Sequence, residues 1–359
     1  MWMDSKAEME WASRTRASFS RRVSNALLLF TGDMEYLDKF MQDKWFVLQL
    51  AVWGLRGVSR VILANNPLSG ALILAALYWD SPWQGLLGTV GVLASTLTAV
   101  ITGQDSGEVA GGLHGFNGML VSLLMGVFSS AGDWYWWLLL PACLGSATCI
   151  FLYSGLATFL QHWDLPAAVF PFNTVIVLYL LGTGPNNPYF PHYPTMPPGE
   201  LEHNGTELVL GGIPLGVGQI FACGALKPSF LILGAVVLYS PLLAVHALLG
   251  SAVGILAGLS VSVRHHSLYS GLSGFNGALG CMAVGGLFFT FNWRTHLFHL
   301  SRMIWDWAAT LTATLMLLLS GNLATYRIPI GQVKAPEHNL HSRSQWEAGN
   351  TVDGESTDV

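Results

Sequence analysis

One short motif in this chain can create hydrogen-bonding chemistry inside an apolar segment. It reads Asp164-Leu165-Pro166-Ala167-Ala168-Val169-Phe170-Pro171-Phe172-Asn173 and stands at the start of an apolar window. Proline lacks an N–H and clashes with the preceding turn, so Pro166 and Pro171 break the helix and leave backbone carbonyls unpaired. Channels use such oxygens to replace the hydration shell of a solute. The motif is therefore a candidate for solute chemistry at membrane depth.

A pair of motifs indicates that the chain is duplicated. Gly112-Leu113-His114-Gly115-Phe116-Asn117-Gly118 and Gly271-Leu272-Ser273-Gly274-Phe275-Asn276-Gly277 differ at one position and lie 159 residues apart. Arg60 and Gln219 keep the same offset. The sequence predicts two membrane repeats, 45–183 and 207–319, and such repeats usually enclose the solute path near their interface.

The glycine-rich motifs also predict irregular backbone. Three glycines and an asparagine in seven residues make a poor continuous helix. Broken backbone at membrane depth is tolerated only where protein or a water-filled cavity covers it. We expect six residues of these motifs to support re-entrant backbone: Gly115, Phe116, Asn117, Gly274, Phe275 and Asn276. Contact between the two asparagines and a solute is the less favoured interpretation.

The composition places these motifs in a multi-span membrane protein. Charged residues make up 10% of the 359 residues, and mean hydropathy is +0.47. A span of about 20 residues crosses the hydrocarbon core. The windows long enough are 83–102, 136–153, 166–183, 229–263 (which could hold two spans) and 271–291. A soluble bundle of buried helices is the alternative that the composition favours least.

The polar segments suggest an orientation. Basic residues in the leader, 1–44, place the N-terminus in the cytoplasm, and 34–46 reads either as an amphipathic surface helix or as ordinary polar leader. The proline-rich segment 184–206 cannot span the membrane and carries a glycosylation sequon at Asn204. We expect it to be extracellular, although a sequon can remain unused. Residues 320–359 form a polar tail.

Other chemistry has little support. The four cysteines lie in apolar stretches without metal-ligand spacing, and we interpret them as packing residues. His246, inside an apolar span, could relay protons but more often such a residue is structural. No nucleophile elbow, zinc motif, phosphate loop or nucleic-acid-binding patch is present. We therefore expect no enzyme activity, no cofactor or metal and no nucleic-acid partner.

The motif at 164–173 resembles the signature of the urea transporter family, Leu-Pro followed after four residues by Pro-Phe. Five further segments resemble vertebrate members in the same order: Thr31-Gly32-Asp33-Met34, Asn65-Asn66-Pro67-Leu68-Ser69-Gly70, Trp136-Trp137-Leu138-Leu139-Leu140-Pro141, Gly216-Val217-Gly218-Gln219-Ile220 and Tyr326-Arg327-Ile328-Pro329. The resemblance covers about residues 27–339.

The resemblance implies an all-α fold of two inverted repeats, each of about five spans with a re-entrant pore helix. It also implies a plasma-membrane homotrimer in which each subunit passes urea down its gradient through a flat slot. Leu165, Pro166, Val169, Pro171 and Phe172 would then supply a carbonyl ladder and its surroundings, with Phe172 as a slot or packing residue.

Two side chains depart from the family pattern. The family usually has glutamine at the position of Arg60, near the pore, whereas its repeat mate Gln219 is kept. An unpaired arginine at membrane depth costs roughly 2.5–3.5 kcal/mol or more. Arg60 could alter selectivity or block the pore; alternatively, it reaches a surface or pairs with a carboxylate. Val169 replaces a threonine, which removes one hydroxyl from the ladder.

The largest departure is a missing segment. The offset of 159 carries Leu165–Asn173 onto Ala324–Gln332, which does not match, so the second repeat is incomplete. About one span, roughly 20 residues, is absent. Because of Arg60 and the missing second signature, the alternative to urea transport is a non-conducting or regulatory family member. A third reading, an ammonium or water channel, is disfavoured because the charge on Arg60 repels cations.

Overall fold

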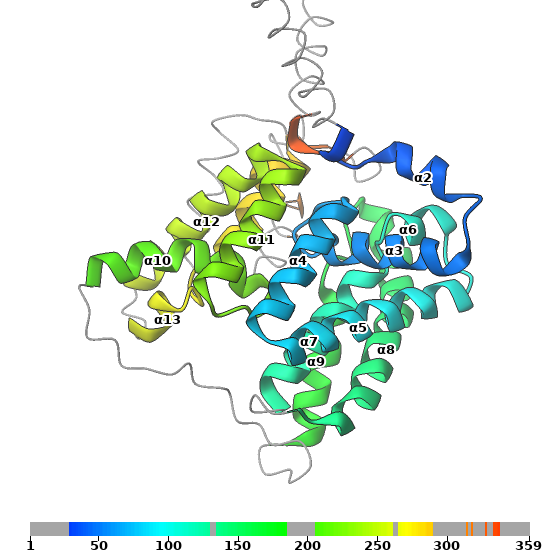
Figure 1. Cartoon of the computed structure of the whole chain (residues 1–359), viewed down its shortest axis with the longest axis horizontal. Coiled ribbons are helices and arrows are strands. Elements are labelled where there is room, and N and C mark those ends of the chain that lie inside the picture. Colours follow the sequence, from blue (N-terminus) through cyan, green and yellow to red (C-terminus); the bar gives the residue numbers. More distant parts are fainter. Residues whose placement is uncertain are drawn as a thin grey trace, which may run out of the picture.

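The computed structural model describes residues 29–129, 134–184, 205–260 and 265–289, with 314, 317–318, 327–328 and 333–337 from the C-terminal part. Every regular element among these residues is helical, and their β pairing is limited to one bridge between Phe289 and Arg327. In chain order the helices are α2 (Glu35–Met41), α3 (Phe46–Arg60), α4 (Pro67–Asp80), α5 (Pro82–Ile101), α6 (Ser106–Ala110), α7 (Gly115–Ser129), η1 (Trp136–Leu138), α8 (Leu139–Leu160), η2 (Gln161–Trp163), α9 (Phe170–Thr183), α10 (Gly205–Gly218), η3 (Gln219–Phe221), α11 (Leu226–Tyr239), α12 (Pro241–Ser260), α13 (His265–Tyr269), α14 (Phe275–Met282) and the π-helix η4 (Ala283–Phe288) (Figure 1).

The helix boundaries repeat with the offset seen in the motifs. Helices α4, α5 and α6 begin and end 159 residues before α11, α12 and α13. Local signals fix these starts: the Asn66 side chain accepts from the backbone N–H of Leu68 and of Ser69, ahead of Pro67 at the first helical position. Ser81-Pro82 and Ser240-Pro241 begin the equivalent pair α5 and α12. The duplication therefore extends to the backbone.

The equivalent helices α4 and α11 of the two repeats run in opposite directions. Helices α4 and α11 lie side by side (Figure 1). Ser69, near the start of α4, donates to the carbonyl of Ala235, near the end of α11, at 2.7 Å. At the other end, the Asp80 carboxylate accepts from the Gly224 N–H, just before α11, at 3.3 Å. This antiparallel pair is what inverted repeats require.

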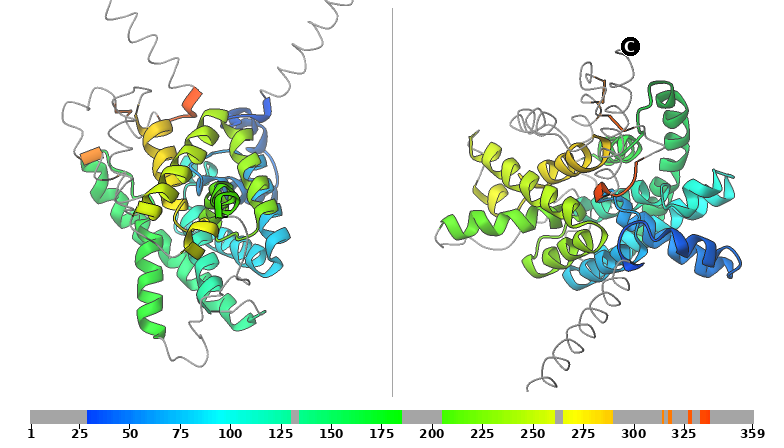
Figure 2. Two further views of the ribbon diagram at one scale, coloured as in Figure 1. Left: turned by 90° about the vertical axis from the view of Figure 1, so that its left-hand side faces the viewer. Right: turned by 90° about the horizontal axis from the view of Figure 1, so that it is seen from above.

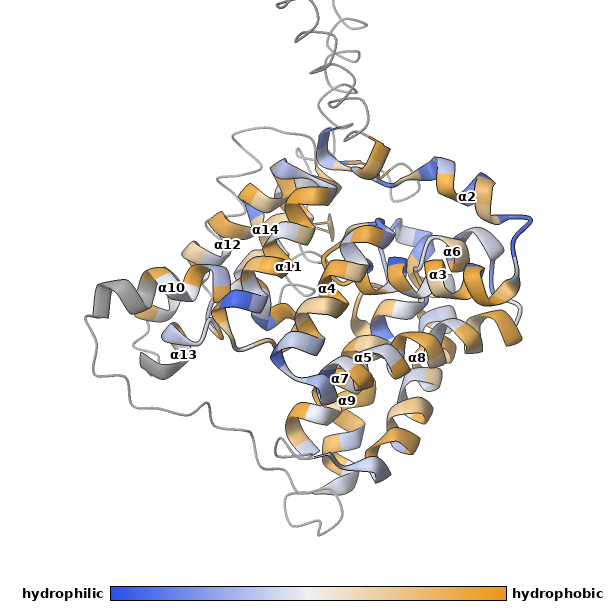
Figure 3. Ribbon diagram, in the orientation of Figure 1, coloured by the Kyte–Doolittle hydropathy of each residue, from blue (hydrophilic) through white to orange (hydrophobic). Residues whose placement is uncertain are grey.

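Among the described residues, three helices are long and apolar enough to cross a membrane: Pro82–Ile101, Trp136–Trp163 and Pro241–Ser260. A fourth candidate is the pair Leu210–Phe221 and Leu226–Tyr239, which bends by 75°. The windows 166–183 and 271–291 hold shorter helices than expected. Pro166 and the turn that follows it delay α9 until Phe170, and a glycine-rich turn delays α14 until Phe275. Apolar residues nevertheless cover most of the described helices (Figure 3).

Glycines allow helices within each repeat to pack closely against one another. A Cβ added to Gly115, at the start of α7, would lie 3.1 Å from the Cα of Gly57 in α3. A Cβ on the equivalent Gly274 would lie 3.4 Å from the Cα of Gly216. Gly112 adopts a positive φ of 71°, which glycine tolerates without strain. The two Gly-Phe-Asn-Gly motifs therefore begin their helices where two backbones cross closely.

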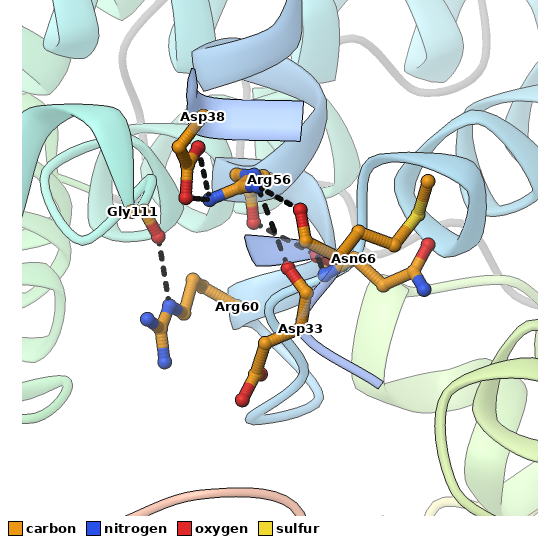
Figure 4. A network of polar contacts seen from close by, with 8 residues as sticks. Asp33, Asp38, Arg56, Arg60, Asn66 and Gly111 are labelled. Atoms are coloured by element: carbon orange, nitrogen blue, oxygen red, sulfur yellow. Dashed lines mark hydrogen bonds and ion pairs between the residues drawn. The ribbon is translucent and has the colours of Figure 1, made fainter. Parts of the chain in front are cut away.

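The leader joins the two repeats. The Asn66 amide donates to the carbonyls of Phe30 and Gly32, while the Gly32 N–H donates to the carbonyl of Tyr239 on α11. Part of the predicted amphipathic segment is helical, as α2, and Arg56 holds it through Asp38 (Figure 4). Residues 1–28, which carry most of the leader's basic side chains, lie outside the described residues.

A short piece of the tail packs on the same side as the leader (Figures 1 and 2). The Glu337 carboxylate accepts from the Ser240 hydroxyl at 2.7 Å and from the Leu242 N–H at 3.3 Å. Ala335 is buried, and Lys334 lies 3.3 Å from Glu35 of α2. Residues 333–337 of the predicted polar tail therefore pack against the second repeat.

Candidate solute site

The segment between α8 and α9 is a broken helix. Helix α8 tightens into η2, after which residues 164–169 leave helical geometry until α9 begins at Phe170. Asp164 and Ala168 both have positive φ, 52° and 44°, which non-glycine residues rarely adopt. The two prolines and these two turns together make the interruption that the motif predicts.

Two backbone carbonyl oxygens in this break are open, which means that they accept no hydrogen bond from the described residues. The Ala167 carbonyl accepts from the Phe170 N–H at 3.2 Å, and the Val169 carbonyl accepts from the Asn173 N–H at 3.0 Å. Within the described part of the chain, the carbonyls of Leu165 and Pro166 accept no hydrogen bond. The open acceptors are thus concentrated at the Leu-Pro end and are fewer than the Leu165–Phe172 ladder that the resemblance implies.

Asn117 holds the break in place. Its side-chain nitrogen donates to the Ala168 carbonyl at 3.1 Å, and its side-chain oxygen accepts from the Phe172 N–H at 3.3 Å. Asn117 is only 2% exposed. One amide therefore supplies both a donor and an acceptor to backbone that has lost its helical partners. Asn276 lies at the equivalent position near the start of α14.

Side chains around the break reach the core between the repeats. Val169 and Phe172 are partly buried and pack against the same cluster as Phe116 of α7 and Phe275 of α14. Leu165 and Pro171 are buried, the former at 5% exposed. The structure thus brings the broken helix and both glycine-rich motifs to one place.

Arg60 and Gln219 lie at the ends of equivalent segments and each bind a backbone carbonyl. Arg60 Nε donates to the Gly111 carbonyl at 2.9 Å (Figure 4). Gln219 Nε2 donates to the Ser270 carbonyl, also at 2.9 Å. Among the described residues no carboxylate lies within ion-pair distance of Arg60. In this part of the chain, the alternative of an Arg60 ion pair does not hold.

Asn65 completes the surroundings of Arg60. With its amide turned to match its neighbours, its oxygen accepts from Arg60 Nη2 at 3.3 Å and its nitrogen donates to the Gly111 carbonyl at 3.2 Å. The second repeat has Gly224 at this position, next to Gln219. The larger cation therefore comes with an additional polar partner that the glutamine does not have.

Two further arginines lie close to the candidate site residues, although the sequence analysis gave neither of them a role at the site. Arg56, one turn before Arg60 and 1% exposed, pairs with Asp38 at 2.9 Å. Arg327 pairs with Asp164 at 3.1 Å. The signal that could have identified both arginines is the scarcity of charged residues in this chain, because a cation inside an apolar protein needs a partner.

Some expected features lie outside the described residues. Asn204 is one of them, and most of Ala324–Gln332 is another. No group of three metal-ligating side chains occurs in the described part.

Comparison with known proteins agrees with the geometry. The family model described as urea transporter matches residues 51–330. A goat (Capra hircus) protein named urea transporter 1 is 39% identical over 346 residues, covering 89% of this chain and 90% of the relative. The rat (Rattus norvegicus) protein of the same name is 40% identical over 337 residues, covering 86% and 87%. The chain belongs to the urea transporter family.

Proposed function

We propose that this chain conducts urea passively across a membrane, down the urea gradient. The observation that carries the proposal is the open carbonyl pair of Leu165 and Pro166, held in a broken helix by Asn117 within an apolar protein. Membership of the urea transporter family, whose relatives are named urea transporter 1, supports the same conclusion.

The chemistry of urea fits such a site. Urea is planar and uncharged, with four N–H donors and one carbonyl acceptor. Removing its water leaves the donors unpaired, which costs about 1–3 kcal/mol for each group unless the protein supplies acceptors. Backbone oxygens at a fixed break supply acceptors without introducing charge. No ion, nucleotide or covalent step is needed.

We assign the side chains as follows. Leu165 and Pro166 provide acceptors, while Val169, Pro171 and Phe172 shape the path where it meets the core between the repeats. Arg60 and Gln219 lie near its two ends and influence which solutes enter. The remaining residues support the re-entrant backbone: Gly115, Phe116, Asn117, Gly274, Phe275 and Asn276.

We also propose the domain organisation, topology and assembly. Residues 45–183 and 207–319 are the two membrane repeats, linked by an extracellular loop, 184–206, with a glycan on Asn204. The leader, 1–44, and the tail, 320–359, are cytoplasmic, which agrees with the packing of residues 333–337 beside the leader. We further propose a homotrimer in the plasma membrane, in which exposed apolar side chains such as Phe151, Leu181 and Leu256 contact lipid or a neighbouring subunit.

Stopped-flow light scattering of proteoliposomes tests the function. Purified protein should raise urea permeability above that of protein-free vesicles, without a pH gradient or added ions. A matched preparation of Asn117→Leu should retain its elution profile and lose most of the urea permeability. If correctly folded wild-type protein gave no urea permeability, the non-conducting alternative would replace this proposal.

A further inference from the structure

The C-terminal part of the chain reaches the broken helix through Arg327. Arg327 Nη2 donates to the carbonyl of Trp163 at 3.4 Å and to the carbonyl of Asp164, and it lies 3.1 Å from the Asp164 carboxylate. Arg327 Nη1 lies 3.5 Å from the Leu317 carbonyl. These oxygens immediately precede the open carbonyls of Leu165 and Pro166.

Apolar packing next to Leu165 also holds the C-terminal residues against the broken helix. Leu165, Val284, Phe289 and Leu317 form one buried cluster, with each side chain at most 5% exposed. The Ile328 N–H donates to the Phe288 carbonyl at 2.9 Å, next to the bridge between Phe289 and Arg327. Of the described residues after η4, Phe289, Leu317 and Arg327 thus lie at the Leu-Pro end of the break.

We propose that the Arg327 guanidinium occludes one end of the carbonyl ladder by occupying backbone acceptors that urea would otherwise use. A guanidinium is planar and presents N–H donors in its plane, as urea does, and here it binds two consecutive backbone carbonyls as a urea molecule would. While Arg327 stays on Trp163 and Asp164, urea cannot use these acceptors to reach Leu165. This regulation rests on the proposed function.

The contact is built to be reversible. Arg327 Nε is buried and has no partner among the described residues, so the guanidinium is incompletely satisfied. The Asp164 side chain is 48% exposed, and water can solvate its carboxylate when Arg327 leaves. Release of the Arg327 side chain therefore opens the ladder without leaving an isolated buried charge on the broken helix.

Urea flux in proteoliposomes tests the occlusion. Arg327→Gln should raise urea permeability several-fold over wild type, and Asp164→Asn should do so to a smaller extent because the two carbonyl contacts remain. Lys334→Gln is the matched control, since Lys334 is a cation of the same tail that pairs with Glu35 instead. An increase of the same size in Lys334→Gln would overturn the proposal, because it would show a general charge effect.

A labelling experiment separates this proposal from the proposed function. Leu165→Cys is treated with a small neutral thiosulfonate, with the protein lacking this cysteine as the blank for the four native thiols. Labelling should be slow in the wild-type background and fast when Arg327→Gln is added. Equal labelling rates would overturn the occlusion. Faster labelling without urea flux in any variant would preserve the occlusion and overturn urea conduction.

Discussion

Arg60 and Gln219 make the same hydrogen bond in the two repeats. Each donates to a carbonyl that lies 51 residues later in the chain, on Gly111 and Ser270 respectively. The geometry at this position is therefore preserved by the repeat, while the charge is not. Any effect of Arg60 on solute passage should come from its charge and size and not from a lost backbone contact.

Replacing Arg60 with glutamine should keep the fold and raise urea permeability. The bond to Gly111 can be made by a glutamine amide, as Gln219 shows with Ser270, so we expect a thermal midpoint within a few degrees of wild type. Under the proposed assignment of Arg60 to the solute path, removing its charge should lower the barrier for a neutral solute. Stopped-flow urea flux and thermal unfolding in detergent measure both effects on the same preparation.

The reciprocal change is the control. Gln219→Arg introduces the same cation into the second repeat, where Gly224 replaces Asn65 and supplies no side-chain partner. We expect lower urea permeability and a lower thermal midpoint than wild type. Unchanged flux in both Arg60→Gln and Gln219→Arg would show that neither position controls solute passage.

Asn117 should be needed in its amide form. Asn117→Asp keeps an oxygen for the Phe172 N–H but replaces the donor to the Ala168 carbonyl with a repelling lone pair. A lost bond at a buried carbonyl costs about 1–3 kcal/mol, and here it also disturbs the ladder. We expect a larger fractional loss of urea flux than of folded protein. A loss of flux that merely follows the amount of folded protein would contradict this role.

The sequence predicted more of this molecule than composition alone suggests. The offset between the two Gly-Phe-Asn-Gly motifs anticipated helix pairs such as α4 with α11, because duplicated sequence carries its caps and breaks with it. The prolines at 166 and 171 likewise located the broken helix. These features are local, and local signals are readable in a single chain.

The contacts between distant segments were not readable in this way. The pairs Arg56–Asp38 and Arg327–Asp164 depend on how the leader and the tail fold back onto the helices. Nor could the sequence show that only Leu165 and Pro166 keep open carbonyls in the described break, since the partner of Ala168 is Asn117, 51 residues away. Long-range pairing of polar groups in an apolar protein is set by the packing.

The close crossing at Gly115 should tolerate no side chain. In Gly115→Ala the new methyl would lie 2.8 Å from Val92 Cγ2 and 3.1 Å from the Cα of Gly57. Overpacking of this kind costs about 1–3 kcal/mol, so we expect a lower thermal midpoint. Adding Val92→Ala should recover part of the loss. Gly155→Ala, where nothing lies within 4 Å, is the control and should change little.

Removing one partner of the ion pair between buried Arg56 and partly exposed Asp38 should cost more stability than replacing both partners. Asp38→Asn leaves the Arg56 guanidinium, 1% exposed, without its counter-charge, and we expect a loss of roughly 1–3 kcal/mol because water still reaches the 39% exposed Asp38 position. Leu215 occupies the position equivalent to Arg56 in the second repeat. The double change Arg56→Leu with Asp38→Asn should therefore recover stability relative to Asp38→Asn alone, measured as the thermal midpoint in detergent. If the double variant were the less stable of the two, Arg56 would be stabilising the leader mainly through its contacts with the Asp33 and Met34 carbonyls.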